Sequence, residues 1–254
     1  MKVSKMRRAL VITLKLVGLK KPVRRVYSFF RSRGFTPWKP LVPEAPFYDC
    51  VRRALIELGA AEKPETIGDY LEFGVSRGTS MAIAYRGIRD AGLNHMRLIG
   101  FDSFEGLPPE AATEGWEPGD YHSTMSATRS YLRRRGVDLK LVTLIKGWFG
   151  DTLSPETRDQ LGVKKASLIM IDCDIYSASK QALAYCEPLM HDHATIMFDD
   201  WGWMVKKGEL GQKEAFEEFL AENPSLCADP RPAYFQEARV FFVTRRPSTT
   251  LISS

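Results

Sequence analysis

The chain has 254 residues, of which 44% are hydrophobic and 26% are charged, as expected for one globular domain with a full core and an appendage. Its four cysteines lack CxxC or CxxH spacing, which argues against a zinc cluster or a disulfide framework and favours a reducing cytoplasm. The formal net charge of +5 is uneven, because residues 1–43 carry 12 of the 36 basic residues and no carboxylate side chain. The remaining 24 basic residues stand against 31 acids, so the body of the chain is acidic.

The N-terminal arm, residues 1–46, is predicted to be a basic amphipathic helix followed by a proline-rich linker. Its apolar residues recur at intervals of three and four: Val3, Met6, Leu10, Leu14 and Val17. Such a helix packs on the acidic body of the same or a neighbouring subunit, or contacts a membrane surface or anionic polymer through residues 2–39. An organellar transit peptide is a third interpretation. The apolar run 9–19 is too short to span a bilayer, so we expect a cytoplasmic protein, with a peripheral site at the inner face of the membrane as the alternative.

Residues 47–254 are predicted to form the main domain, in which short apolar runs alternate with helical patterns. This alternation indicates an α/β fold with a doubly wound, mostly parallel sheet. Strands are expected at 68–74, 97–102, 141–146, 167–172, 194–199 and 238–244. Helices are expected at 47–58, 80–90, 126–135, 177–190 and 213–222. Because right-handed crossovers bring the carboxyl ends of parallel strands to one edge, ligands should bind there.

A glycine-rich turn follows the first predicted strand and opens a helix, which is the context of a nucleotide-cofactor site. Its candidate contacts are Glu72, Gly74, Ser76, Gly78 and Thr79. The ExGxxxG spacing differs from the GxGxxG that binds a pyrophosphate. S-adenosylmethionine has no phosphate, and its methionine carboxylate and ammonium can meet a turn N–H and an upstream acid. Asp102 ends the second strand, where a carboxylate can accept the ribose hydroxyls; a turn-capping aspartate is the alternative.

Two later strands also end in carboxylates. Asp172 and Asp174 follow the apolar run 168–171, and Asp199 and Asp200 follow 195–198. If these strands are neighbours, Asp172, Asp199 and Asp200 converge on an all-oxygen site suited to Mg²⁺ rather than zinc. A metal there favours a hydroxyl acceptor, because coordination lowers the hydroxyl pKa, with Asp172 or Asp174 as general base. The alternatives are a helix cap for Asp174 and a turn residue for Asp200.

The polar segment between the second strand and its following helix contains His122 and is a candidate lid over the acceptor. His122 is a further candidate base, with an exposed loop histidine as the alternative. Aromatic side chains that either wall an acceptor pocket or pack in the core are Trp116, Tyr121, Trp201 and Trp203. His191 and His193 precede a strand and are expected at the edge opposite the ligands.

Five segments together resemble the metal-dependent O-methyltransferases of the macrocin O-methyltransferase (TylF/MycF) family: 70–80, 101–108, 147–153, 171–177 and 198–201. The resemblance implies a seven-stranded, Rossmann-like class I methyltransferase fold. It places Glu72 and Gly74 at the methionine end of the cofactor and Asp102 and Ser103 at its ribose. Gly147, Trp148 and Phe149 are placed at the adenine, and Asp172, Asp199 and Asp200 as the magnesium ligands, with Asp172 also the expected base.

The sequence therefore predicts transfer of a methyl group from S-adenosylmethionine to a hydroxyl of a sugar or glycosylated natural product, with Mg²⁺ assistance. Two departures from the family pattern, the arm at 1–46 and Trp201 in place of a tyrosine, bear on acceptor choice. A homo-oligomer is compatible with the sequence, and specific nucleic-acid binding is not expected. The alternatives are a glycosyltransferase that uses Asp172 and Asp174 as a DxD motif, and a non-catalytic relative that binds a membrane or polyanion.

Overall fold

The computed structural model describes residues 26, 29–30, 33, 41–202 and 209–246. The helix predicted for the N-terminal arm lies outside the described residues, so the membrane, polyanion and oligomer contacts expected of it stay predictions. Among the described helices, none is both long enough and apolar enough to cross a bilayer.

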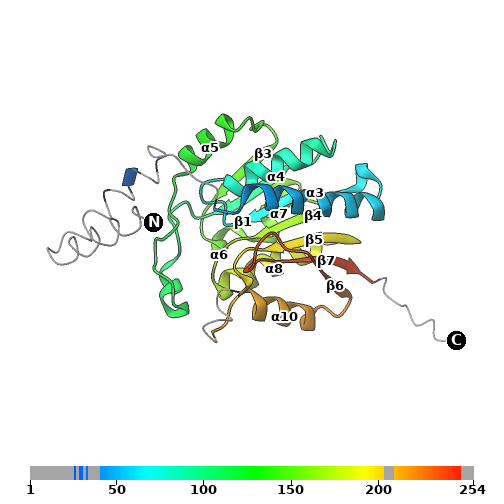
Figure 1. The fold of residues 1–254 in the computed structure, drawn as a ribbon. Helices are drawn as coiled ribbons and strands as arrows, with labels where there is room; N and C mark the ends of the chain where they lie inside the picture. Colours follow the sequence, from blue (N-terminus) through cyan, green and yellow to red (C-terminus); the bar gives the residue numbers. More distant parts are fainter. Residues whose placement is uncertain (1–25, 27–28, 31–32, 34–40, 203–208, 247–254) are drawn as a thin grey trace, which may run out of the picture.

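A seven-stranded sheet forms the centre of the molecule, in the order β3-β2-β1-β4-β5-β7-β6 (Figure 1). Its strands are β1 (Asp69–Phe73), β2 (Leu98–Asp102), β3 (Val142–Lys146), β4 (Ala166–Ile171), β5 (His193–Phe198), β6 (Leu226–Arg231) and β7 (Arg239–Arg245). The first five are parallel, and β7 runs antiparallel to both β5 and β6. The predicted doubly wound, mostly parallel α/β fold is confirmed.

Helices cover both faces of the sheet, and each face has its own apolar core (Figure 1). One face carries α3 (Glu44–Ala61), α4 (Thr79–Asp90) and α5 (Met125–Arg134). The other carries α6 (Phe149–Thr152), α8 (Tyr176–Cys186) and α10 (Gln212–Glu222), and α7 (Pro155–Leu161) precedes β4. Short 3₁₀ turns are η1 (Pro64–Thr66), η2 (Pro109–Glu114) and η3 (Glu187–Leu189). The central strands are buried on both sides, which is why they are continuous apolar runs in the sequence.

Three local features differ from the sequence predictions. Helix α3 begins at Glu44, inside the predicted linker, because Pro46 falls in its first turn, where a proline costs no hydrogen bond. Strand β6 was not predicted, since it contains Pro230 and buries only Leu226; an edge strand tolerates both features. Helices α6 and α7 were also not predicted, because they are short and contain no fully buried residue.

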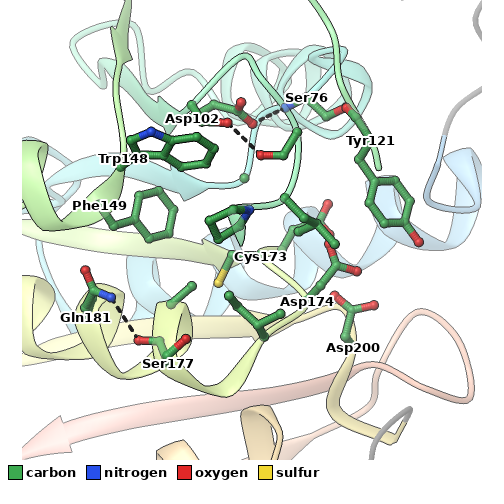
Figure 2. Close-up of a pocket in the computed structure, with 18 of the residues that line it drawn as sticks. Ser76, Asp102, Tyr121, Trp148, Phe149, Cys173, Asp174, Ser177, Gln181 and Asp200 are labelled. Atoms are coloured by element: carbon green, nitrogen blue, oxygen red, sulfur yellow. Dashed lines mark hydrogen bonds between the residues drawn. The ribbon is translucent and has the colours of Figure 1, made fainter. Parts of the chain in front are cut away.

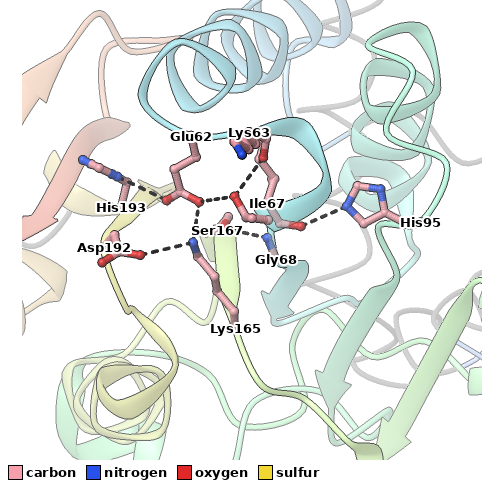
Figure 3. A network of polar contacts seen from close by, with 10 residues as sticks. Glu62, Lys63, Ile67, Gly68, His95, Lys165, Ser167, Asp192 and His193 are labelled. Carbon is pink, nitrogen blue, oxygen red and sulfur yellow. Dashed lines mark hydrogen bonds and ion pairs between the residues drawn. The ribbon is translucent and has the colours of Figure 1, made fainter.

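A buried ionic cluster fastens α3 to the amino ends of two strands (Figure 3). The Glu62 carboxylate, just after α3, pairs with the ammonium of Lys165, and its Oε1 lies 3.2 Å from Nδ1 of His193 at the start of β5. The side chains of Glu62 and Lys165 are only 7% and 14% exposed. His193 therefore lies at the edge opposite the strand ends that carry the carboxylates, as predicted. These contacts join α3 to the sheet, so the cluster stabilises the fold and is separate from the candidate active site.

Candidate active site

A pocket of about 260 Å³ opens at the carboxyl ends of the parallel strands (Figure 2). It is lined by most of the residues predicted for cofactor and metal, namely Gly74, Ser76, Asp102, Ser103, Gly147, Trp148, Phe149, Asp172, Asp199 and Asp200. In Figure 2, Asp102, Trp148 and Phe149 lie on one side, and Asp174 and Asp200 lie on the other. One cavity thus joins the turn after β1 to the acids after β4 and β5.

The turn after β1 is shaped by backbone constraints at Gly74 and Gly78. Gly74 has φ +93°, and a Cβ built on it would lie 1.7 Å from the carbonyl oxygen of Asp172. Gly78, with φ +73°, is the N-cap residue of α4, and a Cβ built on it would lie 3.1 Å from the side chains of Thr128 and Leu132. Only glycine fits at position 74, because the chain there needs both a left-handed backbone and close approach to β4.

Glu72 is fully buried and does not line the pocket described above. Its carboxylate accepts hydrogen bonds from the hydroxyls of Tyr70 and Ser80, both at 2.6 Å. Burial raises the pKa of Glu72 to about 7. Through its bond to Ser80, the Glu72 carboxylate therefore joins β1 to the first turn of α4. Gly78 and Thr79, the other predicted contacts outside the pocket wall, also shape this turn, and Thr79 Oγ1 accepts the Leu41 N–H at 3.3 Å.

Asp102 holds the first two loops of the sheet together. Its Oδ2 accepts the N–H of Ser76 at 2.7 Å, and its Oδ1 accepts the N–H of Phe104 at 2.5 Å. Burial raises the pKa of the Asp102 carboxyl, and these backbone donors act against that shift. Each oxygen retains a lone pair that can accept a hydroxyl from the pocket, so Asp102 is suited both to order the turn and to bind a diol.

Asp172, Asp199 and Asp200 come together as the sequence predicted. Each offers a carboxylate oxygen, and the three oxygens lie within 4.8 Å of one another. Burial and the neighbouring carboxylates raise the pKa of Asp172 and of Asp200 well above the usual range, and burial raises the pKa of Asp199 to about 6. Asp200 Oδ2 is buried without a hydrogen-bond partner among the described residues. Hard oxygen donors, mutual repulsion and an unpaired buried oxygen fit a divalent cation such as Mg²⁺.

The three acids are held by residues far along the chain. The hydroxyl of Tyr234, which is 5% exposed, donates to Asp199 Oδ1 at 2.7 Å. The N–H of Asp200 donates to Oε1 of Gln212 at 3.0 Å. Neither contact has a local signal in the sequence, because each joins a side chain to a residue 12 or 35 positions away.

The candidate bases differ in position. Asp174 lines the pocket with a left-handed backbone, φ 62°, and burial with the nearby Asp199 raises its pKa to about 7. His122 is not among the described residues that line the pocket, and burial lowers its pKa. Its neighbour Tyr121 does line the pocket. The structure thus brings Asp172 and Asp174 to the cavity wall, and His122 is not among the described residues that form that wall.

The predicted aromatic wall is supplied by Tyr121. Trp116 contacts the Tyr121 ring edge-on, with ring centroids 6.5 Å apart, and is not itself on the pocket wall among the described residues. Trp201 is partly buried and packs against the core instead, with its ring centroid 5.1 Å from those of Phe198 and Phe241. Trp203 lies outside the described residues.

The segment between β2 and α5 contributes to the pocket wall and is fastened to α8. Glu114, at the end of η2, accepts the N–H of Tyr176 at 2.6 Å and the hydroxyl of Ser177 at 2.6 Å. It caps a helix whose own N-cap residue makes no side-chain cap hydrogen bond. The role of Glu114 has no local signal in the sequence, because its partners lie 62 and 63 positions away. Glu110 and Gln181 also line the pocket and were not predicted.

The seven-stranded sheet and the pocket at its carboxyl edge define a Rossmann-like fold of the class I methyltransferase type. The family model for macrocin O-methyltransferase (TylF) matches residues 53–223, and the chain belongs to this family. The resemblance predicted from the sequence is confirmed. Membership of an O-methyltransferase family argues against the glycosyltransferase alternative.

A curated relative from Streptomyces olivaceus, 8-demethyl-8-(2,3-dimethoxy-alpha-L-rhamnosyl)-tetracenomycin-C 4'-O-methyltransferase, is 27% identical over 143 residues. The match covers 53% of each protein, so this chain spans about half the length of that relative.

Solved structures share the fold. The O-methyltransferase NovP matches with a TM-score of 0.64 and 17% identity over 80% of each chain. The calicheamicin methyltransferase CalS11 matches at 0.58 and 17% over 76% of each chain. An O-methyltransferase from Bacillus cereus in complex with SAH matches at 0.56 and 14%, over 89% of this chain and 90% of that one. At these identities the likeness establishes the fold.

Proposed function

We propose that the protein transfers the methyl group of S-adenosylmethionine to a hydroxyl of a sugar or glycosylated natural product, assisted by Mg²⁺. The observation that carries this proposal is the single pocket in which the turn at Gly74 and Asp102 faces the acids Asp172, Asp199 and Asp200. A methyl donor bound at the turn and a hydroxyl bound at the acids would then share one cavity.

The donor side of the pocket suits S-adenosylmethionine. Asp102 is placed to accept the ribose hydroxyls, and the rings of Trp148 and Phe149 beside it offer apolar faces to an adenine (Figure 2). The backbone at Gly74 and Ser76 can approach the methionine end closely. The solved structure of the Bacillus cereus O-methyltransferase contains SAH, which supports the same ligand here.

Methyl transfer requires a nucleophilic acceptor oxygen, and a hydroxyl becomes a better nucleophile as it loses its proton. The oxygen attacks the methyl carbon, the C–O bond forms as the C–S bond breaks, and the sulfur keeps the electron pair to give S-adenosylhomocysteine. The hydroxyl proton passes to a carboxylate, and both Asp172 and Asp174 lie on the pocket wall. A divalent cation held by Asp172, Asp199 and Asp200 supplies Lewis-acid polarisation of the acceptor hydroxyl. Tyr121 forms the aromatic wall on the acceptor side.

The relatives favour a sugar as the acceptor. The curated relative is named for methylation of a rhamnosyl group on tetracenomycin C, and it matches half of this chain. Tyr121, 43% exposed and on the pocket wall, offers a ring face against which a sugar can pack.

A methyl-transfer assay tests the proposal. The full chain is incubated with S-adenosylmethionine labelled in its methyl group, Mg²⁺ and a panel of rhamnosyl and related glycosides, with and without chelator. We expect transfer to one glycoside hydroxyl, and a loss of at least about 100-fold with chelator or in Asp200→Asn. Calorimetry that detects no binding of S-adenosylhomocysteine would refute the donor assignment. Activity that is unchanged by chelator would refute the metal role alone.

A further inference from the structure

Gln212, the first residue of α10, is a fully buried polar side chain that does not line the pocket. Its amide Nε2 donates to the carbonyl oxygen of Ile171 at 3.1 Å. Its Oε1 accepts the N–H of Asp200 at 3.0 Å. Both ends of one neutral side chain are therefore bonded to backbone groups of two different strand ends.

These backbone groups belong to the segments that carry the three acids. Ile171 is the last residue of β4 and precedes Asp172, and it pairs with Phe198, the last residue of β5. The Ile171 carbonyl also accepts the N–H of Asp199 at 3.1 Å. The Gln212 amide adds a second bridge across the same two strand ends, one residue further along, where the regular ladder has stopped.

The Gln212 bridge lies where electrostatic repulsion between carboxylates would push the ends of β4 and β5 apart. Asp172, Asp199 and Asp200 repel one another, and that repulsion helps to raise the pKa of Asp172 and of Asp200. A neutral amide bonds to both strands without adding charge. Phe216 and Phe219 pack α10 into the core, so the amide is held on a rigid element.

We propose that Gln212 is a positioning residue for the divalent-cation site, fixing the separation of Asp172 and Asp200. This inference rests on the metal assignment in the proposed function. Metal ligands must hold their oxygens to within a few tenths of an ångström, and residues behind the ligands provide that precision. Gln212 satisfies the main-chain groups beside two ligands and touches neither the donor nor the acceptor part of the pocket.

The test measures Mn²⁺ affinity by electron paramagnetic resonance on the full chain saturated with S-adenosylhomocysteine. Gln212→Met keeps the length of the side chain and removes both hydrogen bonds. We expect Mn²⁺ binding to weaken by about 10- to 100-fold and the Mg²⁺ concentration for half-maximal activity to rise in parallel. The affinity for S-adenosylhomocysteine should stay within about twofold, because the cofactor turn is untouched.

The matched control is Phe219→Leu, which loosens the same helix two turns further along without touching an acid. It should lower thermal stability and leave Mn²⁺ affinity unchanged. Unchanged Mn²⁺ binding in Gln212→Met would overturn the proposal. So would joint loss of Mn²⁺ and S-adenosylhomocysteine binding, because Gln212 would then support the whole fold. Wild-type protein that binds no Mn²⁺ would instead remove the metal assignment on which the inference rests.

Discussion

The Cα of Gly74 faces the carbonyl of Asp172 so closely that a Cβ on Gly74 would lie 1.7 Å from that oxygen. The two strands also join there through the N–H of Asp172, which donates to the carbonyl of Phe73 at 2.9 Å. The turn assigned to the cofactor and the strand that carries the first metal ligand are therefore in backbone contact. A substitution that forces these two segments apart should therefore affect both sites.

Gly74→Ala should weaken both S-adenosylhomocysteine and Mn²⁺ binding, since the turn and β4 must move apart to admit a methyl group. The loss in free energy of unfolding should exceed the about 1–2 kcal/mol that a left-handed backbone costs a residue with a Cβ. Calorimetry and urea denaturation measure these effects.

Gly92→Ala is the matched control, because Gly92 has φ +77° and its Cβ would meet no described atom within 4 Å. It should cost only the backbone term of about 1–2 kcal/mol and leave both ligands bound. Equal effects of the two substitutions would show that the contact with Asp172 is unimportant.

Asp102→Asn should weaken S-adenosylhomocysteine binding by about 10- to 100-fold. The asparagine amide cannot accept the N–H groups of both Ser76 and Phe104, so one buried donor faces another and the turn shifts. Asp229→Asn, an exposed carboxylate on β6, is the control and should leave affinity unchanged. Calorimetry at fixed salt compares them, and full affinity in Asp102→Asn would exclude its role in the donor site.

Elements that leave a pattern within a short stretch of sequence, such as the buried parallel strands, were predicted correctly. Buried parallel strands are continuous apolar runs, and the acids that follow β4 and β5 converge because these strands are neighbours. Strand β6 has no such pattern, since Pro230 and its exposed residues occur only because it lies at the sheet edge.

Which side chains reach the pocket could not be predicted from spacing alone. Glu72 belongs to the expected motif, yet its carboxylate accepts hydrogen bonds from Tyr70 and Ser80 and does not line the pocket. Gln212, Tyr234 and Glu114 reach the site region from distant segments, through side-chain hydrogen bonds that leave no periodic signal. Tertiary packing determines these contacts, and only the folded chain displays them.

Divalent cations should stabilise the protein more at about pH 8 than at about pH 5.5. In the folded protein the pKa of Asp199 is about 6 and that of Asp174 about 7, both raised by burial. The unfolded chain releases these protons near about pH 4. Without metal, the stability that these two groups contribute therefore falls as the pH rises from about 4 to about 7. A cation bound by Asp172, Asp199 and Asp200 replaces the protons on these ligands and relieves their part of this cost above about pH 7.

Thermal melting with and without Mg²⁺ at the two pH values measures this difference. The double variant Asp199→Asn, Asp200→Asn removes two ligands and should abolish the Mg²⁺ effect at both pH values. An Mg²⁺ shift in Tm that is the same at both pH values in the natural chain would contradict the carboxylate site.

Tyr234→Phe should weaken Mn²⁺ binding by about tenfold, because the Asp199 carboxylate loses the donor that fixes its Oδ1. Burial and the adjacent Asp199 raise the pKa of Tyr234 well above its usual value, so the hydroxyl remains a donor across the working pH range. Tyr185→Phe is the paired control: its hydroxyl is buried and lacks a hydrogen-bond partner within the described part of the chain. Removing that hydroxyl should leave Mn²⁺ affinity unchanged and stability equal or higher, since no bond is lost. If both phenylalanine variants bind Mn²⁺ alike, Tyr234 only fills space against Phe47, whose ring centroid is 4.9 Å away, and the position of Asp199 must then depend on its backbone alone.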